Sequence, residues 1–230
     1  MASGVSYLRP SADISLGHDI YPTSGTSTGF DRINEEVNDG HSTHITSIVK
    51  GESGTVGSAT SQFAMSGIIP DGSKCTGAKW HIVARAGDTD EVTNCTAVAG
   101  FTVDGAVYTS TISITDMSTY TPYSADVSGL PGAINTYILQ NGTFPAVTLT
   151  LTSNGVSAGS GANKEYTVME ITQVYLELSY EEQTDIGVHV KIGGTWTGAT
   201  QAYKKVNGAW VEITTDECKT ILQNSFCIRG

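Results

Sequence analysis

Charged residues are scarce in this chain, and basic residues are the scarcest of them. Only 15% of the 230 residues are charged, whereas typical soluble domains have about 25%. Ser, Thr, Asn and Gly must therefore supply most of the polar surface. The chain has 12 Lys and Arg against 23 Asp and Glu, which gives a net charge of −11. Because an acidic surface repels phosphate groups, the composition argues against binding to nucleic acid or to anionic membranes.

Cysteine is sparse as well, and its spacing excludes a dense disulfide framework. The four cysteines, Cys75, Cys95, Cys218 and Cys227, form no CxxC pair, so the pattern fits no common zinc site. We expect free, partly buried thiols. Two bridges stay open, Cys75–Cys95 and Cys218–Cys227, and the second is the more plausible because it would join a helix to a terminal strand.

Long apolar runs are missing too. No segment approaches the roughly 18 apolar residues that a membrane-spanning helix needs. The opening stretch, MASGVSYLRPSADIS, has no apolar region after a basic start, so the sequence predicts no standard secretory leader. We expect a protein made in a cytoplasm, with no insertion into a membrane.

The catalytic signatures GxSxG, HExxH, the P-loop and the Rossmann fingerprint are all absent. His41 and His44 lie three residues apart, but on a strand they would face opposite ways and could not share a metal ion. Glu35, Glu36 and Asp39 form an acidic group without the DxDxDG spacing of a calcium loop. The sequence therefore predicts no enzyme, no metal and no cofactor.

The longest strand pattern in the chain spans residues 166–181, YTVMEITQVYLELSYE. Apolar residues occur on both of its faces, so we predict that it lies centrally in its sheet. Val168, Val174, Leu176, Leu178 and Tyr180 fall on one face, and Met169, Ile171 and Tyr175 fall on the other. Two charges, Glu170 and Glu177, interrupt this pattern. Arg85 is a candidate partner, and an edge or solvent-exposed position is the alternative.

Turn signals divide the rest of the first 182 residues into short strands. The pattern alternates at 78–86 and 97–103, and Asp104-Gly105 predicts a two-residue hairpin. Further strands are predicted at 43–49, 62–68, 106–114, 120–127, 137–139 and 147–152, with a loop at 153–163. Residues 1–30 are predicted to be an irregular N-terminal arm, and 30–37 a short helix. The expected fold is all-β, a two-sheet jelly-roll-like β-sandwich over residues 31–182.

A different composition marks residues 183–230 as a small C-terminal module. VKIGGTW at 190–196 and KKVNGAW at 204–210 form a weak repeat, which predicts two hairpins organised by Trp196 and Trp210. TTDECKTILQN at 214–224 predicts one short helix after a capping box. So small a module has a thin core, so we expect it to dock on a partner or to oligomerise.

Aromatic side chains give the one hint of a ligand. Trp80, Tyr108 and Tyr137, together with Tyr120 and Tyr123, could offer apolar platforms to a sugar. Packing between the two sheets is the simpler explanation, and the sequence favours it.

A resemblance to a known group rests on particular motifs. The chain opens with LRPSADISLGH, continues through a Gly/Ser/Thr stretch to FDRINEEVNDGHSTHI, and closes its sandwich with ITQVYLELSYEE. Over residues 5–182 it resembles minor structural proteins of tailed bacteriophages, which are β-sandwich proteins of the virion surface. The tail, with GGTW and NGAW, is similar to small Gly-x-Trp modules appended to phage structural proteins. The resemblance implies a virion component and supplies no catalytic residues.

From these observations we expect a non-enzymatic virion protein, assembled in the host cytoplasm and displayed on the particle. Head decoration, head fibre, collar and tail appendage all fit. Partners would be other capsid or tail proteins, and particle symmetry favours a homo-oligomer, a trimer above all. The main alternative is a carbohydrate-binding adhesion module for host or mucosal glycans, and a hydrolase of cell-surface polymer is a third.

Overall fold

The computed structural model describes residues 3–21, 28–34, 43–50, 53–87, 92–158 and 164–182, and the backbone of four later strands within 189–213. The chain divides into two units. One comprises residues 4–71 and 75–180, and the other comprises residues 1–3, 72–74 and 181–230. No helix among the described residues is long and apolar enough to cross a membrane.

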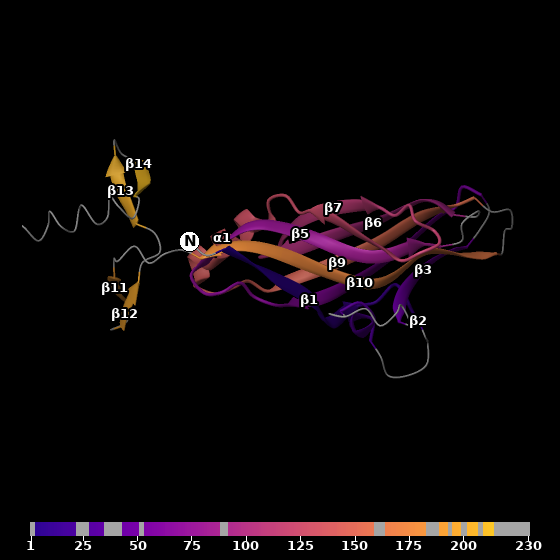
Figure 1. Cartoon of the computed structure of the whole chain (residues 1–230), viewed down its shortest axis with the longest axis horizontal. Coiled ribbons are helices and arrows are strands. Elements are labelled where there is room, and N and C mark those ends of the chain that lie inside the picture. Colours follow the sequence, from indigo (N-terminus) through magenta and orange to yellow (C-terminus); the bar gives the residue numbers. More distant parts are fainter. Residues whose placement is uncertain are drawn as a thin grey trace, which may run out of the picture. The chain divides into compact units, whose positions relative to one another are not determined.

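Ten strands build the larger sheet structure (Figure 1). In chain order they are β1 (Ser3–Ser15), β2 (Asp19–Tyr21), β3 (His44–Lys50), β4 (Val56–Ser66), β5 (Ser73–Ala86), β6 (Val92–Val103), β7 (Ala106–Ser113), β8 (Thr121–Asp126), β9 (Val147–Ser157) and β10 (Glu165–Glu182). We call the order β8-β5-β10-β3-β2 sheet A and the order β1-β4-β9-β6-β7 sheet B. The two are continuous because β10 also pairs with β1. The result is a nearly closed antiparallel sandwich, which confirms the prediction of a mainly β-sheet sandwich fold.

The core lies between the two sheets. Trp80 of β5, Phe63 of β4, Phe101 of β6 and Leu176 of β10 are all completely buried. β10 has β5 on one side and β3 and β1 on the other, which confirms the prediction of a central strand. A shift of register between Thr167 and Met169 explains why its buried positions change face along the strand.

The prediction of an irregular N-terminal arm over residues 1–30 is wrong. Residues 3–15 form β1, which hydrogen-bonds to both β10 and β4 and so joins the two sheets. Pro10 hides this strand in the sequence, because proline usually demotes a strand prediction. Here it sits at a register shift in the pairing with β4, where proline is tolerated. The predicted helix at 30–37 appears as one 3-10 turn, η1 (Phe30–Arg32), and 35–37 lie outside the described residues.

The predicted strand at 137–139 is also wrong, because the α-helix α1 (Leu130–Asn141) occupies this segment. Leu130 and Ile134 share its buried face at helical spacing. Pro131 falls in the first turn, where proline suits a helix, and Gly142 ends the helix with a φ of 70°. Proline and glycine also mark turns, so the signals at the two ends of this helix do not by themselves distinguish a helix from a strand between two turns.

β9 continues to Ser157, past the predicted start of a loop at 153. Its inward positions there are Ser153, Gly155 and Ser157 rather than apolar residues, so the hydrophobic alternation stops before the strand does. A Cβ on Gly155 would lie 2.5 Å from a Val168 methyl group, so this end of the sheet requires a residue without a side chain.

Hairpins occur where dipeptide turns predicted them. Val103 pairs with Ala106 across Asp104-Gly105, and both turn residues have positive φ, 49° and 77°. In the smaller unit, β11 (His189–Ile192) pairs with β12 (Thr195–Gly198), and β13 (Ala202–Val206) pairs with β14 (Ala209–Ile213). The packing of these hairpins, and any helix at 214–224, lies outside the described residues.

Candidate functional site

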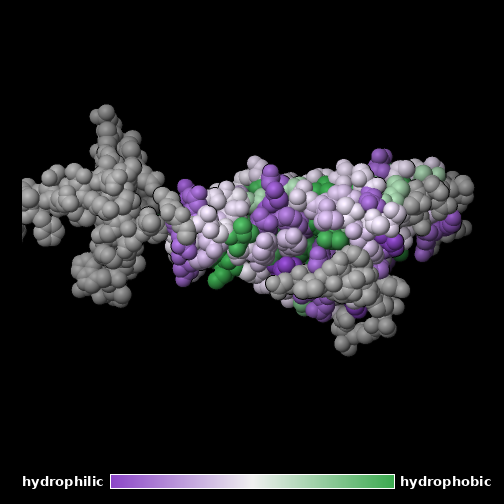
Figure 2. Space-filling model, viewed as in Figure 1, coloured by the Kyte–Doolittle hydropathy of each residue, from purple (hydrophilic) through white to green (hydrophobic). Residues whose placement is uncertain are grey.

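Alternation along β5 and β10 gives sheet A a buried inner face and a polar outer face. On β5 the inner face carries Trp80, Ile82 and Ala84, all fully buried, while His81 and Arg85 point outward. On the face shown in Figure 2, apolar residues form separate patches among pale and purple ones. Two clusters of titratable and aromatic side chains lie on the outer face of sheet A, and the second extends from β10 onto β1.

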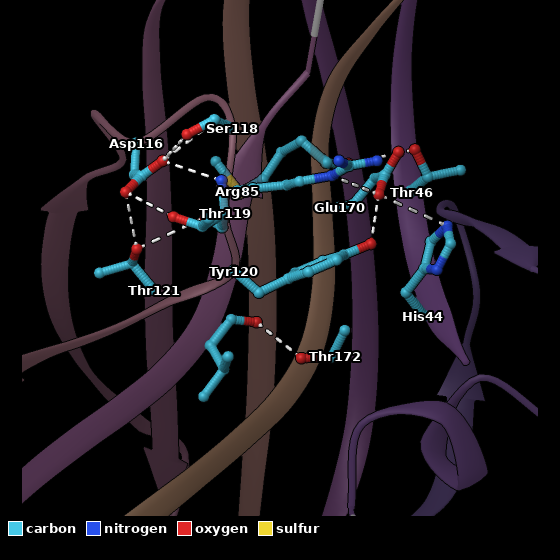
Figure 3. A network of polar contacts seen from close by, with 12 residues as sticks. His44, Thr46, Arg85, Asp116, Ser118, Thr119, Tyr120, Thr121, Glu170 and Thr172 are labelled. Atoms are coloured by element: carbon cyan, nitrogen blue, oxygen red, sulfur yellow. Dashed lines mark hydrogen bonds and ion pairs between the residues drawn. The ribbon is translucent and has the colours of Figure 1, made fainter. Parts of the chain in front are cut away.

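The first cluster, which we call the Glu170 cluster, comprises His44, Arg85, Tyr120 and Glu170 (Figure 3). These residues come from four neighbouring segments, namely β3, β5, the residue before β8, and β10. Arg85 Nε donates to Glu170 Oε2 at 2.8 Å, and the Tyr120 hydroxyl donates to the same oxygen. His44 Nε2 lies 3.9 Å from that oxygen, and the Arg85 guanidinium lies 4.9 Å from the centre of the Tyr120 ring.

The electrostatics of this cluster stabilise its charged form. Burial alone would raise the pKa of Glu170, but the hydrogen bonds from Arg85 and Tyr120 outweigh it and bring the pKa below its usual value. The hydrogen bond to Glu170 raises the pKa of Arg85. Burial, reinforced by the bond to Glu170, raises the pKa of Tyr120. Glu170 is thus a fixed carboxylate at neutral pH, unsuited to donating a proton, and the cluster ties together four segments of the chain.

A tight turn positions Tyr120. The Asp116 carboxylate accepts hydrogen bonds from the backbone of Ser118 and Thr119 at 3.0 Å each, and from the hydroxyl groups of Thr119 and Thr121. Figure 3 shows this turn beside the Glu170 cluster. These bonds, led by the one from the Thr119 backbone, lower the pKa of Asp116. The turn therefore fixes the segment from which the Tyr120 ring reaches across Arg85.

The second cluster, which we call the Tyr175 cluster, comprises Tyr7, Arg9, His81, Tyr175 and Glu177. The His81 ring stacks on Tyr175 with 4.6 Å between centroids and 9° between planes. The edge of Tyr7 meets the same ring at 5.6 Å, and the Arg9 guanidinium lies 4.9 Å from its centre. His81 Nε2 is 3.1 Å from Glu177 Oε2, so Glu177 finds its partner on β5.

This cluster combines an exposed ring with groups that recognise polar ligands. Tyr7 is 49% exposed and lies on β1 two residues from Val5, itself 46% exposed. Burial lowers the pKa of His81 despite the neighbouring Glu177 carboxylate, and burial, with a contribution from Tyr7, raises the pKa of Tyr175. The arrangement places an imidazole whose burial favours the neutral form beside an aromatic surface and the Glu177 side chain.

A third polar group lies inside the sandwich. His18 Nδ1 is 2.7 Å from the Ser61 hydroxyl, and His18 Nε2 is 2.8 Å from the Ser153 hydroxyl. A serine beside a histidine resembles a nucleophile with its base. Here Ser61 and Ser153 are completely buried and His18 is 3% exposed, so no substrate can reach them. Burial lowers the pKa of His18 to about 4. The group joins the segment after β1 to strands β4 and β9.

The residues proposed from the sequence as sugar platforms lie on different elements, Trp80 on β5, Tyr108 on β7 and Tyr137 on α1. Trp80 is completely buried in the core, so its proposed role toward a glycan is wrong, and the simpler packing explanation holds. Tyr108 packs against the core from β7 and lies against Gly129. Tyr137 lies half-buried on α1. By contrast, the predicted pairing of Glu170 with Arg85 is confirmed.

Other predicted positions divide between described and undescribed parts of the chain. Cys75 and Cys95 are free, buried thiols, and burial raises the pKa of Cys75 to about 11. Among the described residues, no group of three or more His, Cys, Asp and Glu could hold a metal ion. Outside the described residues lie Cys218 and Cys227, the histidine His41, and the acidic residues Glu35, Glu36 and Asp39. The side chains of Trp196 and Trp210 belong to this undescribed part as well.

Sequence reasoning missed the Tyr175 cluster and the His18 group. Tyr7 and Arg9 were missed because β1 was not recognised as a strand. The available signal was the alternation of Val5, Tyr7 and Arg9 on one side of 3–15, which Pro10 obscured. The His18 partners are serines on inward positions, for which a hydrophobic pattern has no signal.

A comparison of the chain with protein-family models found none that matches. A comparison with curated protein sequences found no match either.

Proposed function

We propose that this chain is a non-enzymatic structural protein displayed on the surface of a tailed bacteriophage particle, as head decoration, head fibre, collar or tail appendage. The observation that carries the proposal is that polar side chains of this chain bond to one another across the fold. The His18 group and the Glu170 cluster each join segments that are far apart in the sequence. Such bonds make a sandwich resistant to local opening. The motif resemblance of residues 5–182 to virion-surface proteins supports the same role.

The proposal includes a jelly-roll-like strand connection and a small C-terminal module. Lys191 pairs with Trp196 in the first hairpin, and Lys205 pairs with Trp210 in the second, at the same place relative to the turn. This equivalence supports a repeat in which both tryptophans organise one module, with a helix at 214–224. One of the two parts would anchor the protein, and its partners would be other virion proteins and further copies of itself.

Particle labelling tests the virion role. Antibodies against the recombinant chain would be applied to virus particles purified by density gradient from cells that encode it, followed by gold labelling and electron microscopy. We expect gold at repeated positions on intact particles, and no gold with pre-immune serum. Antigen that remains wholly in the soluble lysate, while purified particles carry none, would overturn the proposal.

A second candidate function, adhesion to host or mucosal glycans, is favoured by the Tyr175 cluster. Its exposed Tyr7 ring, next to Arg9 and Glu177, combines an apolar surface with charged hydrogen-bonding groups, as saccharide sites do. A glycan array with the full chain tests it. If the cluster binds sugar, Tyr7→Ala loses the signal while Tyr137→Ala on α1 retains it. Equal loss in both variants, or no binding by the unmodified chain, would remove this function.

A further inference from the structure

The described part of the sandwich ends in three strands that hydrogen-bond to a neighbouring strand on one side only, namely β2, β7 and β8, and β7 also lies close to β8 without pairing with it. Free sheet edges invite pairing with other chains, so proteins usually shorten them or protect them with charge or proline. β2 is three residues long and begins with Asp19. β8 contains Pro122 and ends at Asp126. Two of the three edges are therefore protected.

β7 has none of these protections. Its sequence, AVYTSTIS, contains no charged residue and no proline. Its pairing with β6 runs from Val103↔Ala106 to Thr96↔Ser113 without a register shift, so no bulge twists the edge away. Val107 is 59% exposed, and Thr109 and Thr111 are exposed as well. β-branched residues of this kind favour strand pairing.

The turn determines which backbone groups face the free edge. In a hairpin with a two-residue turn, the flanking pair, here Val103 and Ala106, exchanges hydrogen bonds. Every second residue of β7 after Ala106 therefore also bonds to β6. The intervening residues direct their N–H and C=O groups outward; they are Val107, Thr109, Thr111 and Ser113. No backbone hydrogen bond from another described segment reaches these groups.

One register uses all four of these outward residues when β7 meets a copy of itself in antiparallel orientation. With Ser110 opposite Ser110 of the other copy at the two-fold axis, Thr109 lies opposite Thr111 and Val107 lies opposite Ser113. Cross-strand threonine pairs are favourable. Charge permits a second copy at this edge. The chain has a net charge of −11, but β7 carries no charged residue, so its pairing with β7 of another copy places no like charges of the strand opposite each other.

We propose that β7 pairs with β7 of a second copy of this chain, about a two-fold axis at Ser110, so that sheet B continues across the dimer. The interface is isologous, as a two-fold axis requires. This dimer is a separate claim from the proposed virion role. Dimerisation is measured in solution and incorporation is measured on particles, so either claim can fail without the other.

Charge placed on the outer face of β7 tests both the interface and its register. The full chain would be studied by sedimentation velocity over a range of concentrations. We expect a monomer–dimer equilibrium for the unmodified chain. The double variant Thr109→Lys with Thr111→Lys puts lysine opposite lysine at both pairs, and we expect the dimer constant to weaken at least tenfold. The matched variant Thr109→Lys with Thr111→Glu puts lysine opposite glutamate, and we expect the dimer to return.

Circular dichroism melting of each variant separates loss of pairing from loss of fold, since both substituted positions are exposed. A further variant, Thr109→Pro, removes an outward N–H while leaving the bonds to β6, and it should also be monomeric. An unmodified chain that stays monomeric at all concentrations, or an oligomer of any order that the double-lysine variant leaves intact, would overturn the interface. A Lys/Glu variant that stays monomeric while folded would overturn the register.

Discussion

Acidification tests the role of His18 in holding the sandwich together. Both ring nitrogens of His18 already lie within hydrogen-bond distance of serine hydroxyl groups, at 2.7 and 2.8 Å, and the side chain is 3% exposed. Protonation would give the buried ring a positive charge, and both of its hydrogen-bonding contacts are to neutral serine hydroxyl groups rather than to a carboxylate. Burial accordingly lowers the pKa of His18 from 6.5 to about 4.

The sign and size of the pH effect follow from this difference. An unfolded chain binds the proton more tightly than the folded chain does, so protonation favours unfolding. The contribution of His18 to stability is fully present above about pH 6.5 and is lost as the pH falls toward 4. With these two pKa values, the free energy of unfolding should fall by about 2 kcal/mol between pH 7.5 and pH 5, and by about 3 kcal/mol at pH 4.

Urea unfolding at pH 7.5 and pH 5 measures this change, and His18→Gln is the variant that isolates it. A glutamine amide can bridge the two hydroxyl groups but does not titrate, so the variant should lose about 2 kcal/mol less than the unmodified chain over this range. His81→Gln, on the outer face, serves as the matched control and should retain most of the pH dependence. Equal pH slopes for His18→Gln and the unmodified chain would refute the reasoning.

The remaining predictions concern contacts between distant segments. Arg85→Met leaves Glu170 without its cation and should cost about 1 kcal/mol of unfolding free energy, a modest value because Arg85 is partly solvated; an unchanged urea midpoint would contradict it. The Asn135 side-chain amide donates to the Cys75 carbonyl and accepts from the Cys75 N–H, at 2.8 Å each. Asn135→Ala should therefore lower the free energy of unfolding by about 2 kcal/mol in the same assay. A decrease of less than a few tenths of a kcal/mol would show that water replaces the amide. Trp210→Ala should disrupt the proposed C-terminal module, and unchanged thermal unfolding together with unchanged particle incorporation would rule this out.

Alternation and turn dipeptides were sufficient to predict most of the sandwich. The pattern around Trp80 located β5, and Asp104-Gly105 located the β6–β7 hairpin, because both signals are local and correspond to one backbone geometry. Prediction failed where local signals had two meanings. Pro131 and Gly142 are equally good turn residues and helix-end residues. Only the tertiary burial of Leu130 and Ile134 decides for the helix.

The candidate site was less predictable, since it depends on which strands become neighbours. Glu170 could be paired with Arg85 from the sequence because each interrupts or faces away from an apolar pattern. Its other donor, Tyr120, depends on β8 lying beside β5, a pairing that no local pattern encodes. The Tyr175 cluster further requires β1 beside β10, the closure that joins the two sheets.

Polar groups on the strands are of two kinds: side chains that are matched within the chain, and backbone groups on a sheet edge that are not. Most of those that interrupt an apolar pattern are matched within the chain: Glu170 by Arg85, and Ser153 by His18. Each match holds together strands far apart in sequence, and a change of register would separate Glu170 from Arg85 and would leave His18 and Ser153 buried without each other. The backbone groups on the free edge of β7 have no such match among the described residues. Because the other two edges of the described sandwich are protected, an uncharged edge is best explained by a partner that completes it, and the test with paired lysines addresses that explanation directly.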